Sequence, residues 1–176
     1  LTLKGAIFAH GRQMGKTLIL PVRWNLATAK PVLGTNPTEK LLTNGIRGSL
    51  KYSDFEWCSW ADNDSVSFTI DLLKLEMLNT LILGCITNNG MAIHKPASVR
   101  VEVSDDNSKF REAVVQSFTS EEIFREGNFI ENLSLKLGGT QARYVRVTAK
   151  GPGVCPASHV RPGQTSRIFF DEVMLE

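Results

Sequence analysis

Short runs of apolar residues alternate with polar residues along much of this chain. In segments 66–72 and 98–103 every second residue is apolar. Because the side chains of a β-strand point alternately to its two faces, this period of two predicts strands with one buried face. Segments 129–137, 143–148 and 168–175 are rich in β-branched and other apolar residues, and we expect them to be strands as well.

The longest apolar run covers residues 77–86. Its hydrophobicity alone would also suit a buried helix, but Gly84 and the turn sequence at 87–90 favour a central strand. The polar cluster at 104–108 predicts a chain reversal, and only 120–126 has a helical pattern. About eight strands with little helix predict an all-β fold, an antiparallel sandwich or barrel.

The first 24 residues fit this sandwich less well than the rest. Two apolar runs, 5–9 and 17–22, flank the glycine-containing segment 11–15, an arrangement that predicts a hairpin. We therefore interpret residues 1–24 as the terminal hairpin of a preceding β-domain with its linker, and residues 25–176 as the sandwich domain.

Composition excludes two classes of partner. The net charge of the 176 residues is only +2, and Lys and Arg are scattered without a dense basic run, so nucleic acid is not expected as a partner. No apolar stretch approaches the roughly 20 residues needed to span a bilayer, so no membrane span is expected.

The three cysteines show no C-x-x-C spacing, which argues against a zinc knuckle and a dense disulfide framework. Cys85 lies in an apolar run and is expected in the core. Cys58 and Cys155 lie in loop-like sequence, where pairing and free thiols both remain possible.

Two polar loops lie beside the predicted strands. Residues 25–32 read N-L-A-T-A-K-P-V, and residues 41–49 read L-L-T-N-G-I-R-G-S. The second loop gathers amide, hydroxyl and carbonyl oxygens around Gly45 and Gly48, where a tight turn can direct several of them to one point. Such a cluster suits a hard cation or a polar ligand.

These loops and several strands together resemble the coagulation factor 5/8 type C, or discoidin, family. The resemblance covers nearly all of 25–176 and implies a jelly-roll β-sandwich of the galactose-binding-like type, a fold whose bacterial members include carbohydrate-binding modules. The matching landmarks, in chain order, are 25–32, 42–45, 68–72, 96–105, 142–147 and 170–173.

One subgroup is closer still. The sequence N-G-I-R-G-S at 44–49, Trp57 downstream and F-F-D-E-V at 169–173 are similar to the discoidin-type domain at the C-terminus of family 20 β-N-acetylhexosaminidases of Bacteroides-like bacteria. This resemblance implies a non-catalytic module of an exported enzyme that is periplasmic, cell-surface or secreted. Its partners would be the upstream catalytic domain and glycans ending in galactose or an N-acetylhexosamine. The alternative is a structural appendage that packs on another domain or subunit without binding sugar.

Catalysis by this chain finds no support in its motifs. There is no G-x-S-x-G, no H-E-x-x-H and no phosphate-binding glycine loop, and three scattered histidines form no triad signature. The carboxylate pairs at 105–106 and 121–122 fall in a predicted turn and a short helix, where solvation is the usual explanation.

The family resemblance also implies a structural calcium ion. Carried over to this chain, its ligands are the Leu41 carbonyl, Asn44, Ser49 and Glu172, a set of oxygens that calcium accepts. Asn44 stands where the family usually has Asp, so the site would hold calcium more weakly. The alternative is that Asn44 and Gly45 form a tight turn whose amide bonds the backbone.

A sugar site needs a flat apolar surface together with planar polar side chains. For Trp57 we favour a role in packing, whereas Trp60 suits either the core or a sugar platform. We expect three loops to meet at one end of the sandwich, although each residue alone also fits a solvated loop. The candidate ligand-binding residues are Trp60, Asp62, Asn88, Asn89, His94, His159, Arg161 and Arg167.

Overall fold

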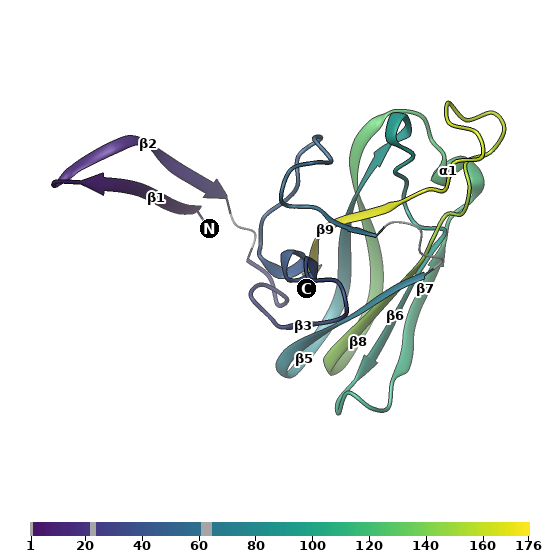
Figure 1. Ribbon diagram of the computed structural model, residues 1–176. Helices are drawn as coiled ribbons and strands as arrows, with labels where there is room; N and C mark the ends of the chain where they lie inside the picture. Colours follow the sequence, from purple (N-terminus) through teal and green to yellow (C-terminus); the bar gives the residue numbers. More distant parts are fainter. Residues whose placement is uncertain (1, 22–23, 61–64) are drawn as a thin grey trace.

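The computed structural model describes residues 2–21, 24–60 and 65–176. Its strands form one two-stranded sheet and one seven-stranded network, and every pairing between them is antiparallel (Figure 1). The predicted all-β fold is confirmed. Within the described residues, no helix is long and apolar enough to cross a membrane.

The two-stranded sheet is the predicted N-terminal hairpin. Strands β1 (Thr2–Ala9) and β2 (Arg12–Pro21) are joined by His10 and Gly11, both with positive φ, as a tight hairpin turn requires. The turn is therefore earlier than 11–15, and Gly15 lies within β2. Figure 1 shows the hairpin projecting away from the sandwich.

Two long strands, β5 (Ser65–Asn88) and β8 (Asn128–Lys150), pair with each other over almost their whole length. Each joins two segments that the alternation pattern predicted as separate strands. The register shifts twice: between Asp71 and Glu76, where Leu73 has a φ of 70°, and between Leu78 and Thr80, opposite Gly138 and Gly139 of β8, which also have positive φ. These irregularities lie where each long strand passes from one layer of the sandwich to the other.

The strand order defines the two layers. In one layer, the first half of β5 pairs with the second half of β8, and β6 and β7 extend that edge while β3 pairs with β5 on the other side. In the other layer, the second half of β5 lies between the first half of β8 and β9, and β4 pairs with β9. The shorter strands are β3 (Val32–Leu33), β4 (Cys58–Trp60), β6 (Ser98–Ser104), β7 (Arg111–Ser117) and β9 (Ile168–Leu175).

Strands β3, β4 and β7 are additions to the predicted set. The first two contain only two and three residues, and β7 is an edge strand without a fully buried side chain, so none has a clear period of two. The predicted helix at 120–126 is shorter, α1 (Ser120–Ile123), and begins with a capping box between Thr119 and Glu122. Two 3-10 helices, η1 (Glu39–Thr43) and η2 (Asn89–Met91), lie in the polar loops.

Apolar side chains from both layers form the main core, which also contains Trp60, Cys58 and Cys85. The Trp60 ring stacks on Phe68 with centroids 6.2 Å apart and meets Phe170 edge-on. A second cluster around Trp57, as expected for a packing tryptophan, lies towards one end of the sandwich.

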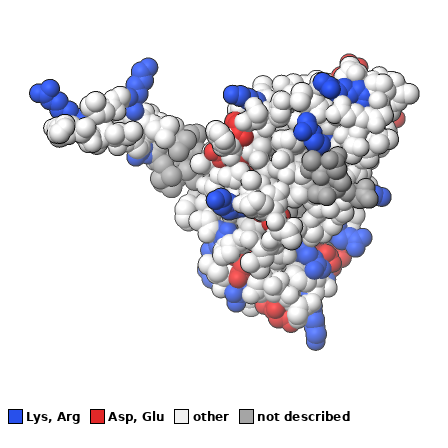
Figure 2. Space-filling model, viewed as in Figure 1, with Lys and Arg blue, Asp and Glu red and all other residues white. Residues whose placement is uncertain are grey.

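All three cysteines are buried and unpaired. Cys58 lies in β4 rather than in a loop, and Cys85 is in the core as expected. On the face seen in Figure 2, basic and acidic groups lie among one another and form no extended basic surface, in keeping with the low net charge.

Candidate functional site

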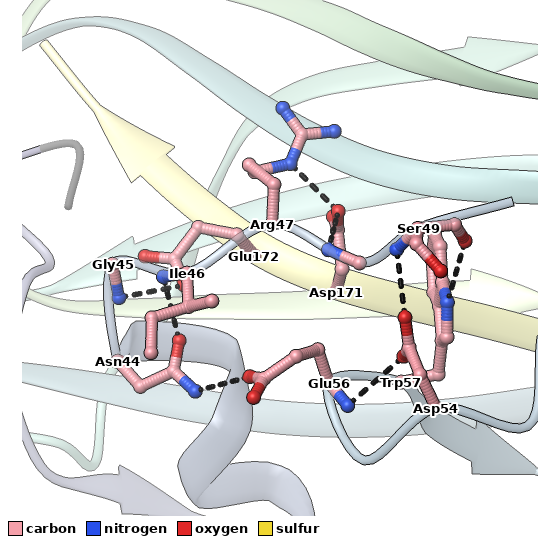
Figure 3. Close-up of polar contacts among 11 residues, drawn as sticks. Asn44, Gly45, Ile46, Arg47, Ser49, Asp54, Glu56, Trp57, Asp171 and Glu172 are labelled. Atoms are coloured by element: carbon pink, nitrogen blue, oxygen red, sulfur yellow. Dashed lines mark hydrogen bonds and ion pairs between the residues drawn. The ribbon is translucent and has the colours of Figure 1, made fainter. Parts of the chain in front are cut away.

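The polar loop at 41–49 is fixed to strand β9 by a buried ion pair (Figure 3). Arg47 Nε donates to Asp171 Oδ2 at 2.6 Å, and the backbone N–H of Gly48 donates to the same oxygen at 2.9 Å. The Asp171 side chain is fully buried. Burial raises the pKa of Asp171, while the Arg47 guanidinium acts in the opposite direction.

Glu172, the next residue of β9, contacts the turn of the same loop. The N–H of Gly45, whose φ is 77°, donates to Glu172 Oε2 at 3.0 Å. Glu172 is fully buried, and its Oε1 has no hydrogen-bond partner among the described residues. Burial raises the pKa of Glu172 to about 8, although the Gly45 N–H stabilises the carboxylate.

Part of the calcium set that the resemblance implies comes together here. The Leu41 carbonyl accepts from the Asn44 N–H at 3.3 Å, and Asn44 is adjacent to the Gly45 that holds Glu172. The Asn44 side chain already bonds the Ile46 N–H through Oδ1 and Glu56 through Nδ2. The turn interpretation of Asn44 is thus directly observed, and the unpartnered Glu172 Oε1 is the atom that fits a cation.

Ser49, the fourth predicted ligand, has other partners. Its N–H donates to Asp54 Oδ2 at 2.9 Å, and its carbonyl accepts from Trp57 Nε1 at 3.1 Å, on the far side of Asp171 from Asn44 (Figure 3). Glu56 is an acid near the turn that sequence reasoning missed. Calcium binding therefore stays a prediction, with Glu172 as the principal anion.

The loop at 25–32 is also fixed to β9. Asn25 Oδ1 accepts from the N–H groups of Ala27 and Leu175, and the Leu26 N–H donates to the Leu175 carbonyl. Both polar loops of the sequence thus meet the C-terminal strand. A cavity of about 420 Å³ lies beside this loop and is lined in part by the exposed Trp24.

A second group of predicted residues meets at the other loops, near α1. Asn89 in η2 contacts His159 in the 151–167 loop, with Asn89 Nδ2 and His159 Nε2 at 3.2 Å. The His94 and His159 rings meet edge-on with centroids 4.9 Å apart. The Arg161 N–H donates to His159 Nδ1 at 3.0 Å, and Arg161 itself is exposed.

Of these residues, Asn89 and His159 border a small pocket of about 140 Å³. Its wall combines an aromatic side chain with polar groups, which are the two elements expected of a sugar site. Phe124, which follows α1, meets both histidine rings edge-on and was not among the predicted residues. The pocket is lined by Asn89, Phe124, Glu126, Pro156, Ser158, His159 and Val160.

The remaining predicted residues have different positions. Arg167 does not line the pocket, and its Nη2 donates to the Met91 carbonyl at 3.0 Å, while the backbone of Asn88 bridges to Ile93. Trp60 is wrong as a sugar platform, since it is only 7% exposed and packs in the main core. Asp62 lies outside the described residues.

Burial determines the charge state of His94. The side chain is fully buried, and burial lowers its pKa to about 4, with His159 acting in the same direction. His94 is therefore neutral at physiological pH. Cys155, also buried, places its Sγ 3.8 Å from His94 Nε2.

Comparison with a family model now identifies the class of the protein. Residues 27–160 match the model of the F5/8 type C domain, so this chain belongs to that family, as its sequence landmarks indicated. No curated protein matches the chain.

Solved structures share the fold at low sequence identity. CpGH89CBM32-6 of Clostridium perfringens has 18% identity and a TM-score of 0.55, with 87% of this chain and 98% of that chain covered. Chitosan-binding module 1 of a chitosanase/glucanase from Paenibacillus sp. IK-5 has 15% identity and a TM-score of 0.56, covering 88% and 99%. The lectin domain of lectinolysin complexed with Lewis B antigen has 16% identity and a TM-score of 0.56, covering 89% and 98%.

Gly84 of β5 leaves the space that the Arg47–Asp171 pair occupies. A Cβ built on Gly84 would overlap the Asp171 carboxylate and the Arg47 guanidinium. We expect Gly84→Ala to lower the free energy of unfolding by about 3 kcal/mol, because overpacking would disturb a buried ion pair. Urea unfolding measures the change, and Gly5→Ala, where a Cβ meets no atom within 4 Å, is the matched control. Equal stability of the two variants would contradict the constraint.

Glu172 should make stability fall as the pH rises. Its pKa is about 8 in the folded chain against an ordinary 4.5, so between these values only the unfolded chain releases the proton. In EDTA, the protonated Glu172 carboxyl makes its full contribution to the free energy of unfolding below pH 4.5. This contribution decreases as the pH rises and is lost as the pH passes 8. Glu172→Gln keeps a neutral side chain and should remove this pH dependence of stability, which amounts to about 4 kcal/mol between pH 5 and 9. Urea unfolding curves of both proteins from pH 5 to 9 test this, and parallel slopes would refute it.

Calcium should raise the melting temperature of the wild type at millimolar concentrations and leave Glu172→Gln unchanged. Asn44→Asp adds a carboxylate to the site and should strengthen calcium binding roughly tenfold. Thermal unfolding against calcium concentration measures both effects, with magnesium as the control ion. Calcium and EDTA giving the same melting temperature in wild type and Asn44→Asp would exclude the site.

Proposed function

We propose that this chain is a non-catalytic carbohydrate-binding module that holds glycans ending in galactose or an N-acetylhexosamine. The observation that carries the proposal is the pocket at the α1 end, where an aromatic side chain and polar groups of three separate loops converge. A sugar ring offers C–H groups to the Phe124 face and hydroxyls to Asn89, Glu126 and His159.

The pocket is large enough to contact one sugar ring but too small to enclose an oligosaccharide. Its volume is about 140 Å³, and Val160 at its edge is 67% exposed. Binding at such a shallow site is expected to be weak, in the millimolar range that corresponds to roughly 4 kcal/mol. A module of this kind gains strength from its attachment to other binding or catalytic units.

The names of structural neighbours support this class of ligand. One neighbour is a chitosan-binding module, and another is a lectin domain complexed with Lewis B antigen. These proteins share the fold, and their ligands suggest the chemistry to be tested on this chain rather than a particular sugar.

We further propose that the module belongs to an exported β-N-acetylhexosaminidase. The N-G-I-R-G-S and F-F-D-E-V sequences support this parent because they resemble the subgroup found at the C-terminus of such enzymes. These two segments meet in the fold through Arg47 and Asp171. The upstream hairpin supports the same arrangement, since its apolar side chains Ile7, Phe8 and Met14 are more than half exposed and suit a neighbouring domain.

That exposed hairpin also favours the alternative function, a structural appendage that packs on a neighbouring domain without binding sugar. Affinity gel electrophoresis against glycans with terminal galactose, N-acetylglucosamine and N-acetylgalactosamine separates the two. A folded chain that none of these glycans retards at millimolar sensitivity would favour the appendage.

The Phe124→Ala variant should bind its glycan at least tenfold more weakly, since loss of an aromatic face costs about 1.4 kcal/mol or more. Phe110→Ala is the matched control. Phe110 is also half-buried, but it packs against Arg146, 3.8 Å from the guanidinium, rather than at the pocket. Isothermal titration of both variants, with melting temperatures to monitor folding, measures the difference. Equal weakening by the two substitutions would place the sugar elsewhere.

A further inference from the structure

Behind the pocket lies a cluster of three side chains whose chemical types are common ligands of soft and borderline metal ions. His94, Cys155 and His159 each offer one ligand atom, and these atoms lie within 4.8 Å of one another. His94 Nε2 and Cys155 Sγ are 3.8 Å apart, close to the roughly 3.5 Å that two ligands of a tetrahedral zinc ion have. The segments that carry them are joined by backbone bonds, since the His94 N–H donates to the Arg167 carbonyl.

The cluster is almost entirely buried. His94, Cys155 and His159 are 0%, 2% and 9% exposed. The thiol has only long polar contacts, 3.8 Å to His94 and 3.5 Å to Ser166 Oγ. Buried polar groups normally have hydrogen-bond partners at short distances. Within the part of the chain that the structure describes, the thiol and the neutral imidazole have no such short partner, so the cluster lacks a group that would bind both.

His94 provides an independent indication of a missing partner. Its side chain is fully buried, and its Nδ1 has no hydrogen-bond partner among the described residues. A water molecule or a ligand from the adjoining pocket can take the fourth corner of a tetrahedral site.

We propose that His94, Cys155 and His159 bind a zinc ion, with a water molecule as the fourth ligand. Thiolate and imidazole ligands select zinc over calcium and magnesium, which prefer oxygen. The site is distinct from the predicted calcium site at Glu172, and it shares His159 with the proposed sugar pocket.

Zinc binding requires one local rearrangement. The Arg161 N–H donates to His159 Nδ1, which places the proton of the neutral ring on Nε2. If His159 coordinates through Nε2, that proton must move to Nδ1 and the Arg161 amide must turn away. Arg161 and its neighbours Val160 and Pro162 are exposed, so this short segment can adjust by the roughly 1 Å that closure of the cluster demands.

Cobalt(II) is the direct probe, because its spectrum reports both the ligand type and the geometry. The metal-stripped, reduced chain should bind about one Co²⁺ and show a thiolate-to-cobalt charge-transfer band with the visible bands of tetrahedral cobalt. Zinc should displace cobalt and raise the melting temperature. Wild-type protein that shows no charge-transfer band and retains no zinc in equilibrium dialysis would overturn the proposal.

Variants locate the site. Cys155→Ala should abolish the charge-transfer band, whereas the double variant Cys58→Ala and Cys85→Ala, which keeps Cys155, should retain it. His159→Ala should weaken zinc binding at least a hundredfold and leave the thiol available. This variant keeps the proposal falsifiable if Cys155→Ala does not fold. Unchanged cobalt spectra in either single variant would refute the assignment. Glycan retention measured with and without zinc is a separate readout, so failure of either proposal is recognisable on its own.

Discussion

The buried contact between Arg47 and Asp171 is the interaction on which the arrangement of this domain depends. It joins residues 124 positions apart and is accompanied by the Gly48 N–H on the same carboxylate. The carboxylate of Asp171 is fully buried, and removing either partner would leave a charge or a donor without compensation. The glycine at position 84 makes room for both groups.

Strand β9 connects this contact to the rest of the fold. Its neighbouring residue Glu172 receives the Gly45 N–H, and Leu175 near its end bonds Asn25. The first loops of the sandwich domain are therefore hydrogen-bonded to its last strand, so contacts between the two ends of the domain hold the fold together. The same strand lies in one layer between β4 and β5, so the anchoring of the loops and the packing of the core support each other.

Regular alternation made much of the fold predictable. Segments 66–72 and 98–103 alternate because one face of each meets the core, and both are strands in the structure. The continuity of β5 and β8 could not be predicted, since the alternation is interrupted around Leu73 in β5 and by Gly138 and Gly139 in β8. The short strand β4 was missed, and with it the position of Trp60, because three residues carry no measurable period.

The sequence by itself determined the family and the all-β class, because turn residues, period-two runs and family landmarks are local properties of the chain. Only the tertiary structure decided that Trp60 is in the core, that Ser49 turns away from Glu172, and that Cys155 lies against His94. Such pairings depend on strand register and on contacts between residues far apart along the chain, which no local pattern encodes.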